Sequence, residues 1–162
     1  MSRKKLILTV TLGVLALLIL SMWSPWNSFR YHGDGKFSDG GFFSYPRYVV
    51  TFADIPLYET SQNTFHFQGL PNDEMTLILF VKDKSANTDG DRRPLEQLKT
   101  RIDATLTGDR GKEACHGYWQ CNNIAVHSNT AYTLVIQVTG ADPKDEGIVV
   151  TPELQGGGLE LP

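Results

Sequence analysis

The chain has 162 residues, of which 41% are hydrophobic and 20% charged, which is the balance of a globular protein with room for one domain and an appended segment. Three of its 15 basic residues lie within the first five positions, so the remainder has 12 basic against 18 acidic side chains. This acidic balance argues against a nucleic-acid-binding face and against docking on anionic lipid headgroups.

The first predicted element is an apolar helix over residues 6–23, which follows the basic tip of residues 1–5. Those 18 residues carry no charge and would reach roughly 27 Å as a helix, close to the ~30 Å of a bilayer's hydrocarbon core. Trp23 and Trp26 suit the membrane interface, and no site of small residues for signal peptidase follows the helix. The sequence therefore predicts an uncleaved signal-anchor; a cleaved signal peptide and a buried core helix are the alternatives.

The orientation of this anchor follows from its flanking charges. Basic residues precede the helix and none follows it closely, so the tip is expected to stay in the cytoplasm. The chain is then a single-pass protein of the inner membrane whose C-terminal domain lies in the periplasm. Residues 24–42 are rich in Gly, Ser and Asp, and they predict a linker between the bilayer and that domain.

Residues 43–154 predict the folded domain. Short runs rich in β-branched and aromatic residues alternate there with turn signals such as TDGD and TGDRG. The predicted strands are residues 48–52, 64–67, 75–81, 99–107, 124–127, 132–139 and 147–151. About seven short strands with this punctuation predict a mainly β protein, an antiparallel Ig-like β-sandwich.

One short stretch carries a family resemblance. Val126, Thr130, Tyr132 and Leu134 match the segment that leads into strand F of fibronectin type III domains, and Ser128 stands where that family has proline. The stretch resembles the tyrosine corner of those domains. The resemblance implies that the tyrosine hydroxyl bonds backward to the backbone and fixes a crossover between the two sheets.

Cys115 and Cys121 are the only cysteines in the chain. A domain exported to an oxidising compartment favours a disulfide between them, which would close a ring of seven residues and stabilise the fold by roughly 2 kcal/mol. A metal site that adds His116 and His127 is an alternative, as is a reactive thiol pair, but neither the zinc spacing nor a C-x-x-C motif is present.

A calcium loop is a candidate site between two predicted strands. Its oxygen-bearing side chains follow EF-hand spacing, with Gly90 at the sixth position. These side chains belong to Ser85, Asn87, Asp89, Asp91 and Glu96. The alternative is a polar loop that uses Asn, Asp and Gly for its turns, because the first ligand is not a carboxylate and Arg92 and Arg93 lie beside the site.

Two further segments are candidates for binding. Tyr118 and Trp119 lie between the cysteines and either form a binding tip or fold into the core. Residues 155–162 form a Gly-rich tail, which is either a mobile end or a strand that a partner orders. The four histidines stand apart from any known catalytic motif, so no residue is assigned a catalytic role.

These features predict a non-enzymatic protein anchored in the bilayer by residues 6–23. Its periplasmic β-sandwich would bind or shield another envelope component, in an accessory or immunity-type role with a protein partner. The alternative is a carbohydrate- or calcium-binding module, and a hydrolase is the least favoured. No cofactor is predicted apart from the calcium alternative, and no nucleic acid is expected as a partner.

Overall fold

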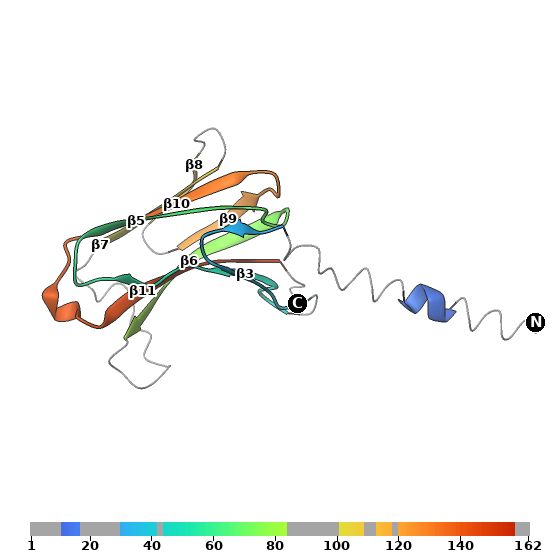
Figure 1. Ribbon diagram of the computed structural model, residues 1–162, viewed down its shortest axis with the longest axis horizontal. Coiled ribbons are helices and arrows are strands. Elements are labelled where there is room, and N and C mark those ends of the chain that lie inside the picture. Colours follow the sequence, from blue (N-terminus) through green and yellow to red (C-terminus); the bar gives the residue numbers. More distant parts are fainter. Residues whose placement is uncertain are drawn as a thin grey trace, which may run out of the picture.

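Two antiparallel β-sheets pack face to face in this protein (Figure 1). The computed structural model describes residues 11–16, 30–41, 44–83, 101–108, 113–117 and 120–157, and only the backbone of Arg101 and of residues 113–117. The predicted antiparallel β-sandwich is therefore confirmed, with more strands than the seven expected.

The two sheets are called sheet A and sheet B. Sheet A consists, in spatial order, of β1 (His32–Gly33), β5 (Ser61–Gln68), β10 (Ala131–Thr139), β7 (Arg101–Thr107) and β8 (Glu113–Gly117). Sheet B consists of β2 (Lys36–Asp39), β3 (Tyr48–Thr51), β11 (Ile148–Gly156), β6 (Asp73–Asp83) and β9 (Gln120–Val126), with β4 (Ile55–Pro56) paired to β11. A short 3-10 helix, η3 (Pro143–Asp145), lies between β10 and β11.

The eight main strands pair in a nested way along the chain. The first, β3, pairs with the last, β11; β5 pairs with β10, β6 with β9, and β7 with β8. Two further pairings, β11 with β6 and β10 with β7, join these hairpins into two sheets. This is the arrangement of a jelly roll. The predicted Ig-like order is wrong, because the last two strands of an Ig-like domain share one sheet, whereas β10 and β11 lie in different sheets.

The core lies between the two sheets and is built by alternating residues. Along β10, Leu134, Ile136 and Val138 are buried while the residues between them reach the outer face. The alternation predicted for β7 is also present, since Ile102, Ala104 and Leu106 are all buried. A period of two places every second side chain on the same face, so each of these strands covers the core with one face.

The side of the sandwich between β5 and β3 is closed by the chain's first described strands. β1 belongs to sheet A and β2 to sheet B, and the chain crosses between them at Asp34 and Gly35. The crossing is fixed by two bonds to His66, whose N–H donates to Asp34 Oδ2 (2.7 Å) and whose carbonyl accepts from Asp34 N–H (2.8 Å). The predicted linker of residues 24–42 is thus corrected, because residues 30–39 belong to the sandwich.

The first and last described residues of the sandwich lie at the same end of it. β1 begins beside the end of β5, and β11 ends beside the start of β6, while residues 69–72 connect β5 directly to β6. Arg30 and Gly157 therefore lie at one end, which we call the Arg30 end. The β4–β5 connection, including Tyr58, lies at the opposite end, here called the Tyr58 end.

The N-terminal anchor prediction lies mostly outside the described residues. Residues 11–16 are helical, and no helix within the described part of the chain has the length and apolar character needed to span a bilayer. The remainder of residues 6–23, together with Trp23 and Trp26, is not among the residues that the structure describes.

The tyrosine corner is confirmed in its local chemistry. The backbone N–H of His127 donates a hydrogen bond to Tyr132 Oη at 2.9 Å, and Tyr132 is buried. The bond spans the turn that carries the chain from β9 in sheet B to β10 in sheet A. The corner therefore fixes a crossover, as the resemblance implied, although the strand order around it is that of a jelly roll.

Removing the corner's hydroxyl should destabilise the domain. Tyr132→Phe keeps the ring but leaves the partly buried His127 N–H without its acceptor, so the free energy of unfolding should fall by about 1–2 kcal/mol. Urea denaturation followed by tryptophan fluorescence measures the change. Tyr58→Phe, at a side chain 44% exposed, is the matched control and should have no effect; an equal loss in both variants would contradict the role of the corner.

Candidate functional site

Most site residues predicted from sequence lie outside the described part of the chain. The calcium-loop residues fall within residues 84–100, and Tyr118 and Trp119 fall between β8 and β9. Within the described ranges, no group of three or more His, Cys, Asp or Glu side chains is arranged to hold a metal ion. The calcium loop and the aromatic tip therefore stay predictions.

The two cysteines belong to the edge strands of different sheets. Cys115 lies on β8 opposite Leu106, and Cys121 lies on β9 opposite Leu77. Cys121 packs against the core. The side chain of Cys115 is not among the described atoms, so its pairing with Cys121 stays a prediction.

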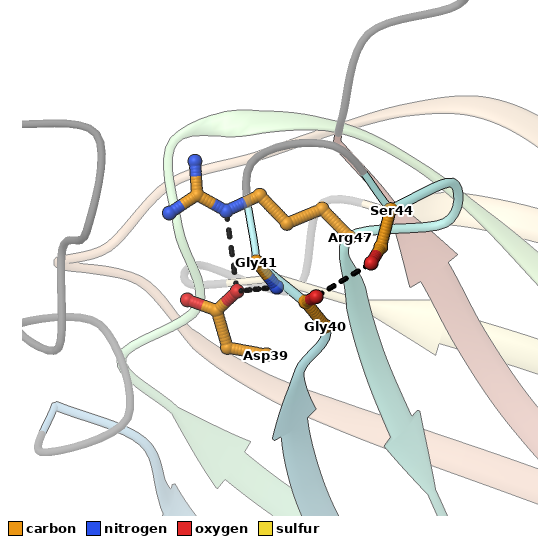
Figure 2. Close-up of polar contacts among 5 residues, drawn as sticks. All are labelled: Asp39, Gly40, Gly41, Ser44 and Arg47. Atoms are coloured by element: carbon orange, nitrogen blue, oxygen red, sulfur yellow. Dashed lines mark hydrogen bonds and ion pairs between the residues drawn. The ribbon is translucent and has the colours of Figure 1, made fainter. Parts of the chain in front are cut away.

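A loop with several internal hydrogen bonds lies at the Arg30 end, between β2 and β3. Asp39 Oδ1 accepts hydrogen bonds from Gly41 N–H (2.9 Å) and from Arg47 Nε (3.2 Å), which is also an ion pair (Figure 2). Ser44 Oγ donates to the Gly40 carbonyl at 2.5 Å, as Figure 2 also shows. These contacts tie the described residues of the loop to one another through their own polar groups.

The same loop is tied to the end of β11. Arg47 N–H donates to the Gly157 carbonyl (3.1 Å), and Gly40 N–H donates to the Arg47 carbonyl (2.7 Å). The loop thereby presents Tyr45, which is 64% exposed and is the most exposed large hydrophobic side chain of the described sandwich.

A concave region of about 280 Å³ lies beside this tyrosine. We call it the Tyr45 groove. Its polar and aromatic lining comes from the β2–β3 loop and from β6, β9 and β11, and consists of Tyr45, Asp73, Glu74, Thr76, Asn123 and Gln155. Met75 also lines it, and Gly156 and Gly157 contribute backbone alone.

The two glycines let the chain pack closely beside the groove. A Cβ on Gly156 would lie 2.6 Å from the Glu74 carbonyl oxygen and 2.7 Å from Met75 Cγ. Gly157 has φ of +68°, and a Cβ there would meet the Tyr48 ring and the Asp73 carboxylate. Any side chain at these positions would clash with neighbouring residues, so the close approach of the chain segments depends on glycine.

A β-bulge places an amide in the groove. Between Met75 and Leu77 the register shifts, so that Asn122 and Asn123 of β9 stand opposite Thr76 alone. Asn123 adopts the left-handed region with φ of 56°, which asparagine tolerates better than most residues. Bulges commonly redirect a side chain away from the regular strand pattern, and here the bulged residue lines the groove.

A second polar groove of about 530 Å³ lies at the same end of the sandwich. Its lining comes from the start of β1, the end of β5 and the β9–β10 turn, and consists of Arg30, His32, Gln68, Gly69, Ser128 and Asn129. Ser128 N–H donates to Asn72 Oδ1 at 2.8 Å, which holds the turn against the β5–β6 connection. Hydrogen-bonding groups dominate this groove, and Arg30 gives it a permanent positive charge.

Among the described residues, Tyr31 is the titratable group whose pKa is shifted most clearly by burial. Its ring stacks between Phe37 and Phe67, with centroid distances of 5.5 and 6.3 Å, and its hydroxyl donates to the Asp34 carbonyl. Burial raises the pKa of Tyr31 well above its usual value, and the negative charge of Asp34 raises it further. The neutral phenol is therefore the form that the fold favours.

This shift predicts a loss of stability in alkali. The folded-state pKa of Tyr31 exceeds the unfolded value of about 10. Its contribution to the free energy of unfolding is therefore complete below about pH 10 and is lost as the pH rises above that value. Tyr31→Phe should flatten the decline of unfolding free energy between about pH 9 and 11. Urea denaturation across this pH range measures the free energy of unfolding of both proteins. If it declined with pH equally steeply in the parent and in Tyr31→Phe, the raised pKa of Tyr31 would be contradicted.

The Tyr45 groove was not found from the sequence. A Tyr-Pro pair within a Gly/Ser-rich segment and an Asn-Asn pair inside a strand are the only local signals for it. No known protein family matches the chain, and a search of curated proteins finds no match either. What the grooves can bind must therefore be argued from their own chemistry.

Proposed function

We propose that this chain is a non-enzymatic binding protein of the bacterial envelope. Residues 6–23 anchor it in the inner membrane, and the jelly roll stands in the periplasm, where it binds or shields another envelope component. A Cys115–Cys121 bridge would join the edge strands of the two sheets and would suit an oxidising compartment.

The observation that carries this proposal is the position of the grooves. Both grooves include residues from the Arg30 end, and Arg30 lies seven residues after Trp23. Seven extended residues span at most about 25 Å, so the anchor would hold the Arg30 end within that distance of the bilayer surface. A component of the membrane-proximal envelope would then be the natural ligand of this end.

Site-directed crosslinking in intact membranes tests the proposal. A photoreactive side chain at Gln68 or Asn129, at the Arg30 end, should capture one defined envelope component. The same group at Tyr58, or at Lys144 of η3, should capture none or less. Recovery of the chain from the cytosol with both thiols reduced, or equal capture from both ends, would overturn the proposal.

A carbohydrate- or calcium-binding module is the second candidate. The exposed ring and the polar lining of the Tyr45 groove favour the carbohydrate form of this candidate. The calcium form depends on residues 85–96 and predicts that calcium raises the melting temperature of the full chain, because a ligand that binds only the folded state stabilises it.

A further inference from the structure

We propose that the Tyr45 groove binds a neutral saccharide chain. This inference deepens the proposed function by naming the class of envelope component, and it rests on that function only for the source of the saccharide. The groove joins an exposed aromatic ring, several planar polar side chains and the backbone of two glycines, and the ring and the polar groups suit a sugar.

The first requirement is an aromatic ring held ready for stacking. A sugar ring has an apolar face of C–H groups that packs against the face of a tyrosine. Tyr45 is 64% exposed, and the loop that carries it is fixed by the Asp39, Arg47 and Ser44 contacts of Figure 2. A ring carried by residues that are already held in place loses less entropy when a ligand binds than one on an unconstrained segment, which favours weak ligands such as sugars.

The second requirement is a set of groups that match hydroxyls. A sugar hydroxyl both donates and accepts, so it pairs well with carboxylates, which accept, and with amides, which do both. Glu74, Asn123 and Gln155 supply these groups from three neighbouring strands. Gln155 Nε2 donates to Glu153 Oε2 at 2.7 Å, an intrastrand bond that orients its amide.

The volume and charge of the groove limit the class of ligand that it can bind. A volume of about 280 Å³ is small for a folded partner and is on the order of one or two sugar rings. The wall carries the carboxylates of Asp73 and Glu74, and none of the described side chains that line it is basic. An acidic polysaccharide would be repelled, so the ligand is a neutral or N-acetylated saccharide.

The experiment uses the full chain in detergent micelles. Isothermal titration with three neutral probes, the hexamers of N-acetylglucosamine, of β-1,4-linked glucose and of α-1,4-linked glucose, should find binding to at least one, with Kd on the order of 1 mM or tighter. Polygalacturonate, an acidic polysaccharide, should not bind. Binding to none of the three neutral hexamers, or tighter binding to polygalacturonate, would overturn the proposal.

Matched variants tie the binding to the groove. Tyr45→Ala should weaken it about tenfold, as expected when one aromatic anchor is lost, whereas Tyr45→Phe keeps the ring and should stay within about threefold of the parent. Asn123→Gly removes the amide but keeps the left-handed backbone and should weaken binding severalfold. Tyr58→Ala removes an exposed ring at the opposite end and should change nothing.

The outcomes separate this inference from the proposed function. Thermal melting of each variant shows whether the fold is intact, and binding that persists in both folded Tyr45→Ala and folded Asn123→Gly would show that the groove is not the site. If no sugar binds but crosslinking captures an envelope protein, the saccharide inference alone fails. If sugars bind in micelles but the chain is cytosolic, the envelope function alone fails.

Discussion

Leu134→Ala should lower the free energy of unfolding by about 3 kcal/mol, within the range measured for buried leucines. Leu134 is fully buried on the central strand of sheet A and lies directly between Phe65 of β5 and Leu106 of β7. Both neighbours are themselves packed into the core, so neither is free to fill the cavity that alanine would leave. Urea denaturation with the linear extrapolation provides the measurement.

Val135→Ala is the control for this prediction. Val135 is the next residue on β10, but it faces outward and is only partly buried. Its truncation removes similar atoms from the same strand and should cost less than about 1 kcal/mol. If the two substitutions destabilised the domain equally, the inner face of sheet A would not be the tightly packed face.

Gly69→Ala should destabilise the domain by about 3 kcal/mol, the sum of backbone strain and a steric clash. Gly69 has φ of +79°, and a Cβ there would lie 1.7 Å from the backbone carbonyl oxygen of Arg30. The clash is with backbone rather than with the tip of a flexible side chain, so the start of β1 would have to move. The second polar groove, which both residues line, should change shape with it.

Gly41→Ala separates the strain from the clash. Gly41 also has a positive φ, +87°, but no described atom lies within 4 Å of the Cβ position. Its substitution should cost only the left-handed penalty of about 1 kcal/mol. Denaturation of both variants gives the difference, and equal losses would show that the contact with Arg30 contributes nothing.

The strands themselves could be predicted because burial on one face leaves a period of two in the sequence. The runs at residues 132–139 and 99–107 correspond to β10 and β7 within two residues. β1 and β2 were missed because two or four residues among glycines carry no such period. They are held instead by contacts far away in sequence, such as Asp34 with His66.

The strand order could not be predicted from these patterns. Alternation tells which face of a strand is buried, but it does not tell which strand lies beside it. The tyrosine corner indicated a crossover before β10 correctly. A crossover of that kind occurs in a jelly roll as well as in an Ig-like domain, so the local motif was right while the global order was wrong.

The groove was beyond sequence reasoning for a similar reason. Tyr45, Asp73, Asn123 and Gln155 are separated by tens of residues and meet only through the pairing of β6 with β9 and β11. The residues singled out from sequence were neighbours in the chain, as in the calcium loop, because spacing is the only proximity that a sequence displays.

The nested strand pairing has a consequence for biosynthesis. β3 pairs with β2 on one side and with β11 on the other, so the β2–β3 pair cannot join the rest of sheet B until the ribosome has made the last strand. A chain that stops before Ile148 would lack the strand that joins β3 to β6. Such long-range pairing slows folding, so sheet B would be completed only after the last strand has been synthesised, whereas the β5–β10, β6–β9 and β7–β8 pairs need no residue of β11.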